Sequence, residues 1–120
     1  MDPTMGVKEN VIQQRIRMAL GSLPTVLVQR RNVGTFYTRD GRPQRIGTPG
    51  EADLQGIIDG QVCVRCGHKV HPLPYALEVK TAVGRQSKVQ KNWQQNVWER
   101  RGGLYAIVRS VEEALKAVGL

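Results

Sequence analysis

The 120-residue sequence lacks any apolar run near the roughly 20 residues that a transmembrane helix needs. Its first residues, MDPTMGVKEN, lack the apolar middle of a signal peptide. Repeats, low-complexity segments and linkers are absent too. We therefore expect one domain over residues 1–120, located in the cytoplasm and without membrane partners.

Acidic residues are also scarce. Ten Asp and Glu stand against eighteen Lys and Arg, for a formal net charge of +8. Such an excess favours a polyanionic partner, most often nucleic acid, because each phosphate neutralised by the protein releases counterions. Solubility alone is the alternative explanation, since net charge indicates partners but no chemistry.

The hydrophobic pattern predicts an alternation of helices and strands. Ile12, Ile16 and Leu20 recur at helical spacing in residues 7–23, and Ser87 opens a second helix that Gly102 and Gly103 close. The predicted strands are 25–31, 52–60, 61–66, 74–81 and 104–108, and the last predicted helix is 110–118. A hairpin or basic loop is predicted at 32–50. The order α-β-β-β-β-α-β-α predicts an α/β or α+β domain with a mixed central sheet flanked by helices.

An acid and a lysine lie two residues apart in the clearest strand, PYALEVKT. Alternation along a strand places Glu78 and Lys80 on the same side. A solvated ion pair on an exposed face is the ordinary explanation of such a pair. However, Asp53 precedes a neighbouring strand, and metal-dependent phosphodiester hydrolysis needs hard oxygen ligands, which Asp53, Glu78 and the Val79 carbonyl can supply. Lys80 can then orient or deprotonate the water or hold the phosphate.

Three segments, GTPGEAD, ALEVKTAVGRQSKVQ and GGLYAIVRSVEEA, together resemble the VRR-NUC domain family of the PD-(D/E)xK nuclease superfamily. The resemblance extends from Glu9 to about residue 114 and implies a restriction-endonuclease-like core and a Mg²⁺ or Mn²⁺ cofactor. It implies that Asp53 and Glu78 bind the metal and that Lys80 is the signature lysine. It further implies that Gln90 is the helix glutamine facing the site and that Glu9 contributes to the metal site.

The chain departs from the family pattern at Ser110, which follows Arg109 where the family has a second arginine. Any role of that second arginine is in doubt, whereas the metal site is unaffected. Two ordinary explanations also stay open: Gln90 has the capping-box spacing from Ser87, and Glu9 is an acid in the first turn of a helix. The predicted DNA-binding residues are Arg42, Arg45, Arg85, Lys88, Lys91 and Arg109.

Both cysteines and both histidines of the chain fall in one short stretch, CVRCGHKVH. Cys63, Cys66, His68 and His71 would sit in a hairpin insertion at about 61–73. Cys-x-x-Cys-Gly resembles a zinc knuckle, although usual four-ligand sites join two distant pairs. Two interpretations of this stretch stay open, a structural zinc site and a hairpin tip with reduced cysteines. A disulfide is disfavoured in the cytosol.

The sequence thus favours a metal-dependent DNA endonuclease. The family resemblance implies that stand-alone phage and bacterial members act as homodimers on branched DNA such as four-way (Holliday) junctions. Trp93, Trp98 and the apolar C-terminal helix are candidates for a dimer contact. The alternative is a non-catalytic nucleic-acid-binding module with a zinc-stabilised hairpin. A sequence-specific restriction enzyme is disfavoured, because a separate recognition domain does not fit in 120 residues.

Overall fold

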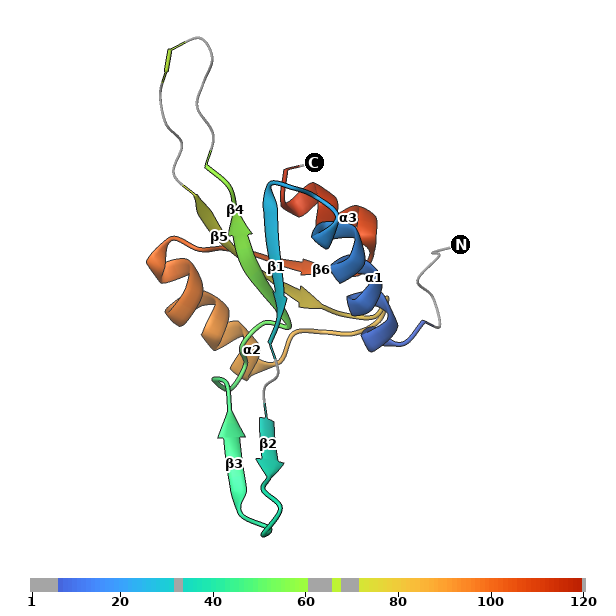
Figure 1. The fold of residues 1–120 in the computed structure, drawn as a ribbon, viewed down its shortest axis with the longest axis vertical. Coiled ribbons are helices and arrows are strands. Elements are labelled where there is room, and N and C mark those ends of the chain that lie inside the picture. Colours follow the sequence, from blue (N-terminus) through green and yellow to red (C-terminus); the bar gives the residue numbers. More distant parts are fainter. Residues whose placement is uncertain (1–6, 32–33, 61–65, 68–71, 120) are drawn as a thin grey trace.

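The computed structural model describes residues 7–31, 34–60, 66–67 and 72–119 (Figure 1). Its elements are α1 (Glu9–Gly21), β1 (Val26–Arg30), β2 (Gly34–Tyr37), β3 (Pro43–Ile46), β4 (Leu54–Ile58), β5 (Leu73–Val79), α2 (Lys88–Asn92), η1 (Trp93–Trp98), η2 (Glu99–Arg101), β6 (Leu104–Val108) and α3 (Val111–Ala117). Strands β1, β4, β5 and β6 form one sheet in that order, antiparallel except for the parallel pair β5 and β6. The predicted fold class, a mixed central sheet flanked by helices, is confirmed.

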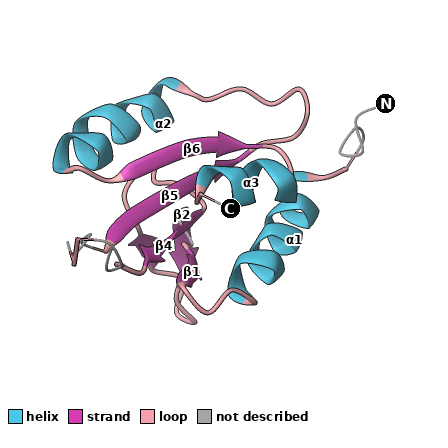
Figure 2. Ribbon diagram, turned by 90° about the horizontal axis from the view of Figure 1, so that it is seen from above, coloured by secondary structure: helices cyan, strands magenta, loops and turns pink. Residues whose placement is uncertain are grey.

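The two faces of this sheet carry different layers (Figure 2). Helices α1 and α3 cover one face, where Tyr75, Leu77 and Val79 of β5 join the larger hydrophobic core. Helix α2 and its continuation cover the other face, where Ala76 packs with Trp93 in a smaller core. Strand β5 is therefore covered on both sides, and its alternate residues serve two different cores.

Helix α1 forms where the apolar spacing predicts it. Ile12, Ile16 and Leu20, four residues apart, are almost completely buried along one side. Burial of each such side chain stabilises the fold by about 2 kcal/mol. Within the described ranges, no helix combines the length and the apolar character needed to cross a bilayer.

The predicted helix has Ser87 as its N-cap, and its backbone hydrogen-bonding pattern changes along its length. Ser87 and Gln90 make a capping box at the start of α2, the segment continues as the π-helical η1, and Gly102 ends it with φ at 88°. Hydrogen bonding between residues five apart brings Trp93 and Trp98 together, with ring centroids 5.1 Å apart. Trp93 is buried and Trp98 packs beside it, so the prediction that these rings supply a dimer contact is wrong for Trp93.

Residues 34–46 form a hairpin outside the main sheet. Strands β2 and β3 pair only with each other, and Figure 1 shows them projecting from the sheet. A hairpin or basic loop was predicted here, and a turn at Asp40 and Gly41 closes the hairpin, with Gly41 at φ 82°. The chain then returns to the sheet at β4.

Strand β4 pairs directly with β5, from Ile58 opposite Leu73 to Leu54 opposite Leu77. Of the predicted strand at 61–66, only Cys66 belongs to the described residues. The other three predicted zinc ligands, Cys63, His68 and His71, lie outside them. Cys66 is exposed, and it forms no disulfide with any of the described residues. The zinc hypothesis stays a prediction.

Candidate active site

Glu78 and Lys80 project from the same side of β5, as alternation predicts, but that side is buried. Only 1% of Glu78 and 8% of Lys80 is exposed. Lys80 Nζ lies 3.8 Å from Glu78 Oε1. The alternative of a solvated surface pair is therefore wrong, and a charged pair kept in the interior requires compensating contacts.

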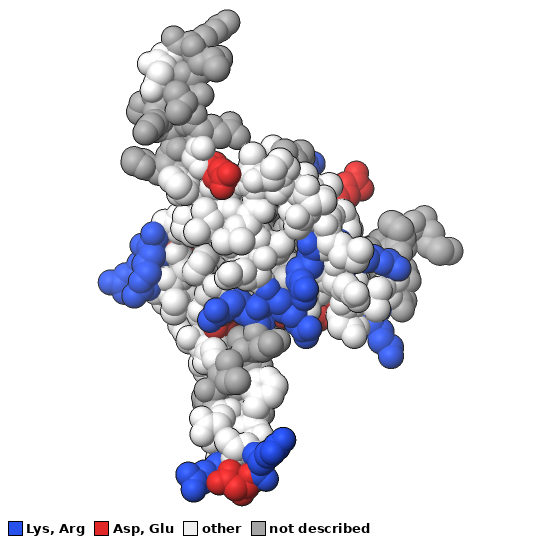
Figure 3. Space-filling view, viewed as in Figure 1, with Lys and Arg blue, Asp and Glu red and all other residues white. Residues whose placement is uncertain are grey.

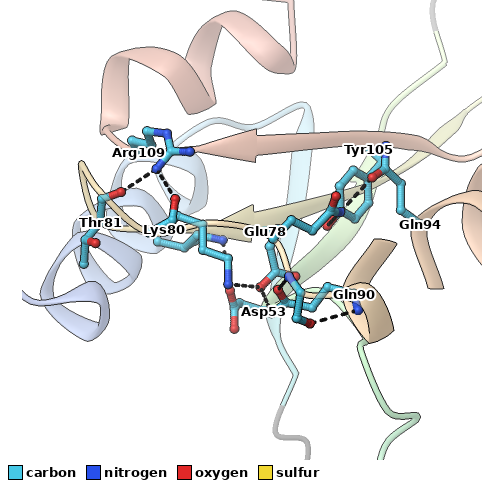
Figure 4. Close-up of polar contacts among 12 residues, drawn as sticks. Asp53, Glu78, Lys80, Thr81, Gln90, Gln94, Tyr105 and Arg109 are labelled. Atoms are coloured by element: carbon cyan, nitrogen blue, oxygen red, sulfur yellow. Dashed lines mark hydrogen bonds and ion pairs between the residues drawn. The ribbon is translucent and has the colours of Figure 1, made fainter. Parts of the chain in front are cut away.

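Asp53 precedes β4, the neighbour of β5, and lies beside Glu78 (Figure 4). Its Oδ2 accepts a hydrogen bond of 2.9 Å from the Val79 backbone N–H. Its own carbonyl accepts one of 2.8 Å from Arg31 N. The Asp53 carboxylate is thus held at the end of the sheet by the strands on both sides of it.

The two carboxyl groups repel each other. Burial, and secondly the charge of Asp53, raise the pKa of Glu78 to about 8, although Lys80 opposes the shift. Glu78 Oε2 is buried, and within the part of the chain that the structure describes it has no hydrogen-bond partner. Because a carboxylate only accepts hydrogen bonds, Glu78 and Asp53 need a proton or a cation between them to interact favourably.

Gln90 links this pair to α2. Its Oε1 accepts from the Ser87 N–H at 2.9 Å, and its Nε2 donates to Glu78 Oε1 at 2.9 Å. The capping role and the site role had been alternatives in the sequence. The structure gives Gln90 both, one at each end of its amide.

Glu9 is the first residue of α1 and lines the same cleft as Asp53. Partial burial, and then the charge of Asp53, raise its pKa. Glu9 is therefore an acid in a helical first turn and also a neighbour of the carboxylate pair.

The loop before Asp53 is fixed by a residue that sequence reasoning missed, Glu51. Its carboxylate accepts hydrogen bonds from Thr48 N at 3.0 Å, Gln55 Nε2 at 2.7 Å and Arg31 Nε at 2.8 Å. Although burial opposes them, these bonds hold the pKa of Glu51 below its ordinary value. The sequence carried a weak signal, because Glu51 follows a turn and precedes Asp53 by two residues.

Gly50 brings that loop against α2. It has φ at 81°, and a Cβ added there would lie 2.2 Å from the Val89 carbonyl oxygen. A residue with a side chain would separate the loop from the helix that carries Gln90.

A second polar cluster lies behind Glu78 and was also missed. Gln86 Nε2 donates to Gln94 Oε1 at 2.7 Å and to the Tyr105 hydroxyl at 3.0 Å. Burial, followed by the charge of Glu78, raises the pKa of Tyr105. No local pattern indicates this cluster, because the pairing of β6 with β5 brings Tyr105 near Glu78.

Arg109 stabilises the turn after Lys80. One of its guanidinium nitrogens, Nη1, donates to the carbonyls of Thr81 at 2.6 Å and Gly84 at 2.8 Å. Its other donors are not engaged by these two bonds, so the predicted DNA contact is still a prediction. Next to it, the Glu113 carboxylate accepts from Arg109 N, while Ser110 Oγ accepts from Glu113 N at 3.2 Å and caps the start of α3.

Four of the other predicted DNA-binding residues lie at the surface. Arg42 pairs with Asp40 at 3.0 Å, and Arg85, Lys88 and Lys91 are exposed on the turn and on α2. The side chain of Arg45 lies outside the described part of the structure. Figure 3 shows Lys and Arg gathered between the sheet and the hairpin and again at the hairpin tip.

The donor set fits a Mg²⁺ or Mn²⁺ ion in one respect. Among the described residues, no three His, Cys, Asp or Glu side chains are assembled as a metal-binding group. Mg²⁺, however, usually uses one or two protein carboxylates and keeps waters and substrate oxygens as its other ligands. The carboxylates of Asp53 and Glu78 meet that requirement, because Glu78 Oε2 accepts no hydrogen bond from the described residues. The Val79 carbonyl stays a predicted ligand.

Comparison with family models, curated proteins and solved structures gave no match to this chain.

Proposed function

We propose that the protein is a metal-dependent DNA endonuclease. The observation that carries the proposal is the buried Glu78 carboxylate, whose Oε2 has no hydrogen-bond partner among the described residues and whose nearest charged neighbours include a second carboxylate, Asp53. A carboxylate pair that destabilises its own ionised form is costly to a fold. A divalent cation would remove that cost.

The proposal gives each residue of the site one task. Asp53 and Glu78 would hold Mg²⁺ or Mn²⁺, with Glu9 at the edge of the same site. When bound, such an ion supplies Lewis acidity toward a phosphate and lowers the pKa of a coordinated water. Gln90 holds Glu78 in place through its 2.9 Å hydrogen bond, and it does so from the rigid first turn of α2.

Lys80 would act on the phosphate or the water. Its ammonium group is buried beside Glu78, where a charge acts more strongly than in bulk water. From that position it can stabilise the charge that develops on the phosphate or orient the attacking water. The alternation of β5 supports this role, because it puts Lys80 on the carboxylate side.

Four narrower statements belong to the same proposal. The excess of Lys and Arg supports DNA as the substrate, and the resemblance to VRR-NUC domains supports branched DNA such as four-way junctions and a homodimer. The same resemblance supports a bacterial or phage-infected cell as the place of action. A non-cutting DNA-binding module is the second outcome of the test below.

The experiment is cleavage of end-labelled duplex, flap and four-way-junction DNA with Mg²⁺, with Mn²⁺ and with chelator. We expect cutting only with a metal and at least a hundredfold loss in Lys80→Ala. Lys116→Ala is the matched control, because Lys116 is exposed on α3 and is not among the predicted DNA-binding residues. Binding without cutting under all conditions would favour the non-catalytic module, and full activity in Lys80→Ala would refute the proposed role of Lys80.

A further inference from the structure

The site opens into a cleft of about 480 Å³ whose walls differ in chemistry. Acidic side chains, including Glu9 and Asp53, lie on the side of α1 and β4, whereas Arg30 and Arg31 end β1. The hairpin supplies Phe36, the only phenylalanine of the chain. The residues that line this one space therefore include an aromatic residue, two arginines and two acids of the candidate metal site, Glu9 and Asp53.

Phe36 is 46% exposed although it lines the cleft. Exposure of so large an apolar side chain costs free energy, which a partner could recover. Its neighbour Tyr37 is 72% exposed. Because consecutive residues of a strand point to opposite faces, Tyr37 projects from the other face of the hairpin.

The chemistry of the cleft matches that of a nucleotide. Aromatic rings bind the faces of nucleobases, and arginines bind phosphates. A base inside a duplex has both faces covered by its stacked neighbours, whereas an unpaired base offers a free face. The ring of Phe36 therefore favours an unpaired nucleotide over a paired one.

We propose that Phe36 stacks on an unpaired base next to the phosphate held at the carboxylate site, so that the protein selects DNA with unpaired nucleotides. This inference rests on the proposed function for the position of the phosphate. Arg30 and Arg31 would contact the backbone on either side. Arg31 is held toward the cleft by its 2.8 Å ion pair with Glu51.

The test is binding in chelator, where no cutting is expected. The probes are a flap DNA with 2-aminopurine among its unpaired nucleotides and a fully paired duplex. Stacking on wild-type protein should quench the 2-aminopurine fluorescence. Phe36→Ala should abolish the quenching and weaken flap binding about tenfold, while leaving duplex binding within about twofold.

Two variants keep the result unambiguous. Phe36→Trp should keep both affinity and quenching, whereas Phe36→Leu, which preserves an apolar side chain, should lose the quenching. Tyr37→Ala is the matched control, because it removes an adjacent exposed ring from the opposite face and should leave flap binding unchanged.

Equal losses on flap and duplex, or equal losses in Phe36→Ala and Tyr37→Ala, would overturn the proposal. A change in molar mass by light scattering in Phe36→Ala, without a change in flap affinity, would overturn it in favour of a second copy of this chain. Failure to cut any DNA with metal would instead refute the proposed nuclease function, because the binding assay does not depend on cutting.

Discussion

The side-chain amide of Gln90 donates to Glu78 Oε1 at 2.9 Å while its oxygen caps the helix that carries it. One residue therefore fixes both the start of α2 and the orientation of a buried carboxylate. Any movement of the helix start would move Glu78, so the packing of α2 on the sheet is part of the site.

Replacement of Gln90 separates these two roles. Gln90→Ala and Ser87→Ala both remove the capping box, and each should lower the free energy of unfolding by about 1 kcal/mol. Only Gln90→Ala also frees Glu78, so we expect it to cut DNA at least tenfold more slowly, with Ser87→Ala near wild type. Urea unfolding and single-turnover cleavage measure the two effects, and equal rates in both variants would contradict the site role.

The raised pKa of Glu78 predicts how stability depends on pH without metal. The folded-state pKa is about 8, above the unfolded value of about 4.3, so the folded protein binds the extra proton between these values. The stabilisation that this proton gives to the folded state is complete below about pH 4.3 and is lost as pH rises through about 8. Groups facing Glu78 from the surrounding elements are Asp53, Lys80, Gln90, Glu9 and Tyr105.

In chelator, the free energy of unfolding should therefore fall between about pH 5 and pH 8, by about 1 kcal/mol per pH unit. Glu78→Gln should flatten this part of the profile, because the amide does not ionise. Glu112→Gln, a surface change on α3, is the control and should keep the wild-type slope. A wild-type slope in Glu78→Gln would show that another group causes the dependence.

Two glycines with the same backbone conformation test the contact between the Asp53 loop and α2. Gly50 and Gly41 have φ values of 81° and 82°, so alanine costs about 1 kcal/mol of strain at either position. A Cβ at Gly50 would clash with the Val89 carbonyl, whereas a Cβ at Gly41 meets nothing within 4 Å. We expect Gly50→Ala to lower stability more than Gly41→Ala and to slow cleavage at least tenfold.

Thermal unfolding and cleavage of the two variants, measured side by side, decide the matter. Similar losses in both would mean that the loop tolerates displacement from α2.

Arg109 and Arg85 should act differently although both were predicted to bind DNA. Arg109→Ala removes the Arg109 donor from the Gly84 carbonyl and leaves the Thr81 carbonyl with only the Gly84 N–H, so it should lower the free energy of unfolding by about 2 kcal/mol. Arg85→Ala, at an exposed position, should leave stability unchanged and weaken DNA binding more at low salt than at high salt. Unfolding curves measure the stability, and titrations of DNA affinity against salt measure the binding. An unchanged stability of Arg109→Ala would contradict its role in stabilising the turn after Lys80.

Local patterns predicted the elements but not the environment that they create. Alternation placed Glu78 and Lys80 on one side of β5, and apolar spacing placed Ile12, Ile16 and Leu20 on the buried side of α1. Neither pattern indicates that the Glu78 side of β5 is covered. That outcome depends on where α2 and η1 pack, which is a long-range contact.

The same limit explains what was missed around the site. Glu51 acquires its role from Arg31, twenty residues away, and Tyr105 from the pairing of β6 with β5. The hairpin was predicted from its turn residues, but its separation from the main sheet follows from β4 pairing with β1 and β5. Sequence spacing carries no information on such partners.

The central claim is that Asp53 and Glu78 form a divalent-cation site. Titration of the protein with Mn²⁺ at pH 8.5, where Glu78 is largely ionised, tests it when free Mn²⁺ is measured by electron paramagnetic resonance. We expect one saturable site that weakens at least tenfold in Glu78→Gln and in Asp53→Asn and that persists in Glu112→Gln and in a Cys63→Ser, Cys66→Ser double variant. Mn²⁺ binding that is absent from the wild type, or unchanged in both carboxylate variants, would contradict the claim.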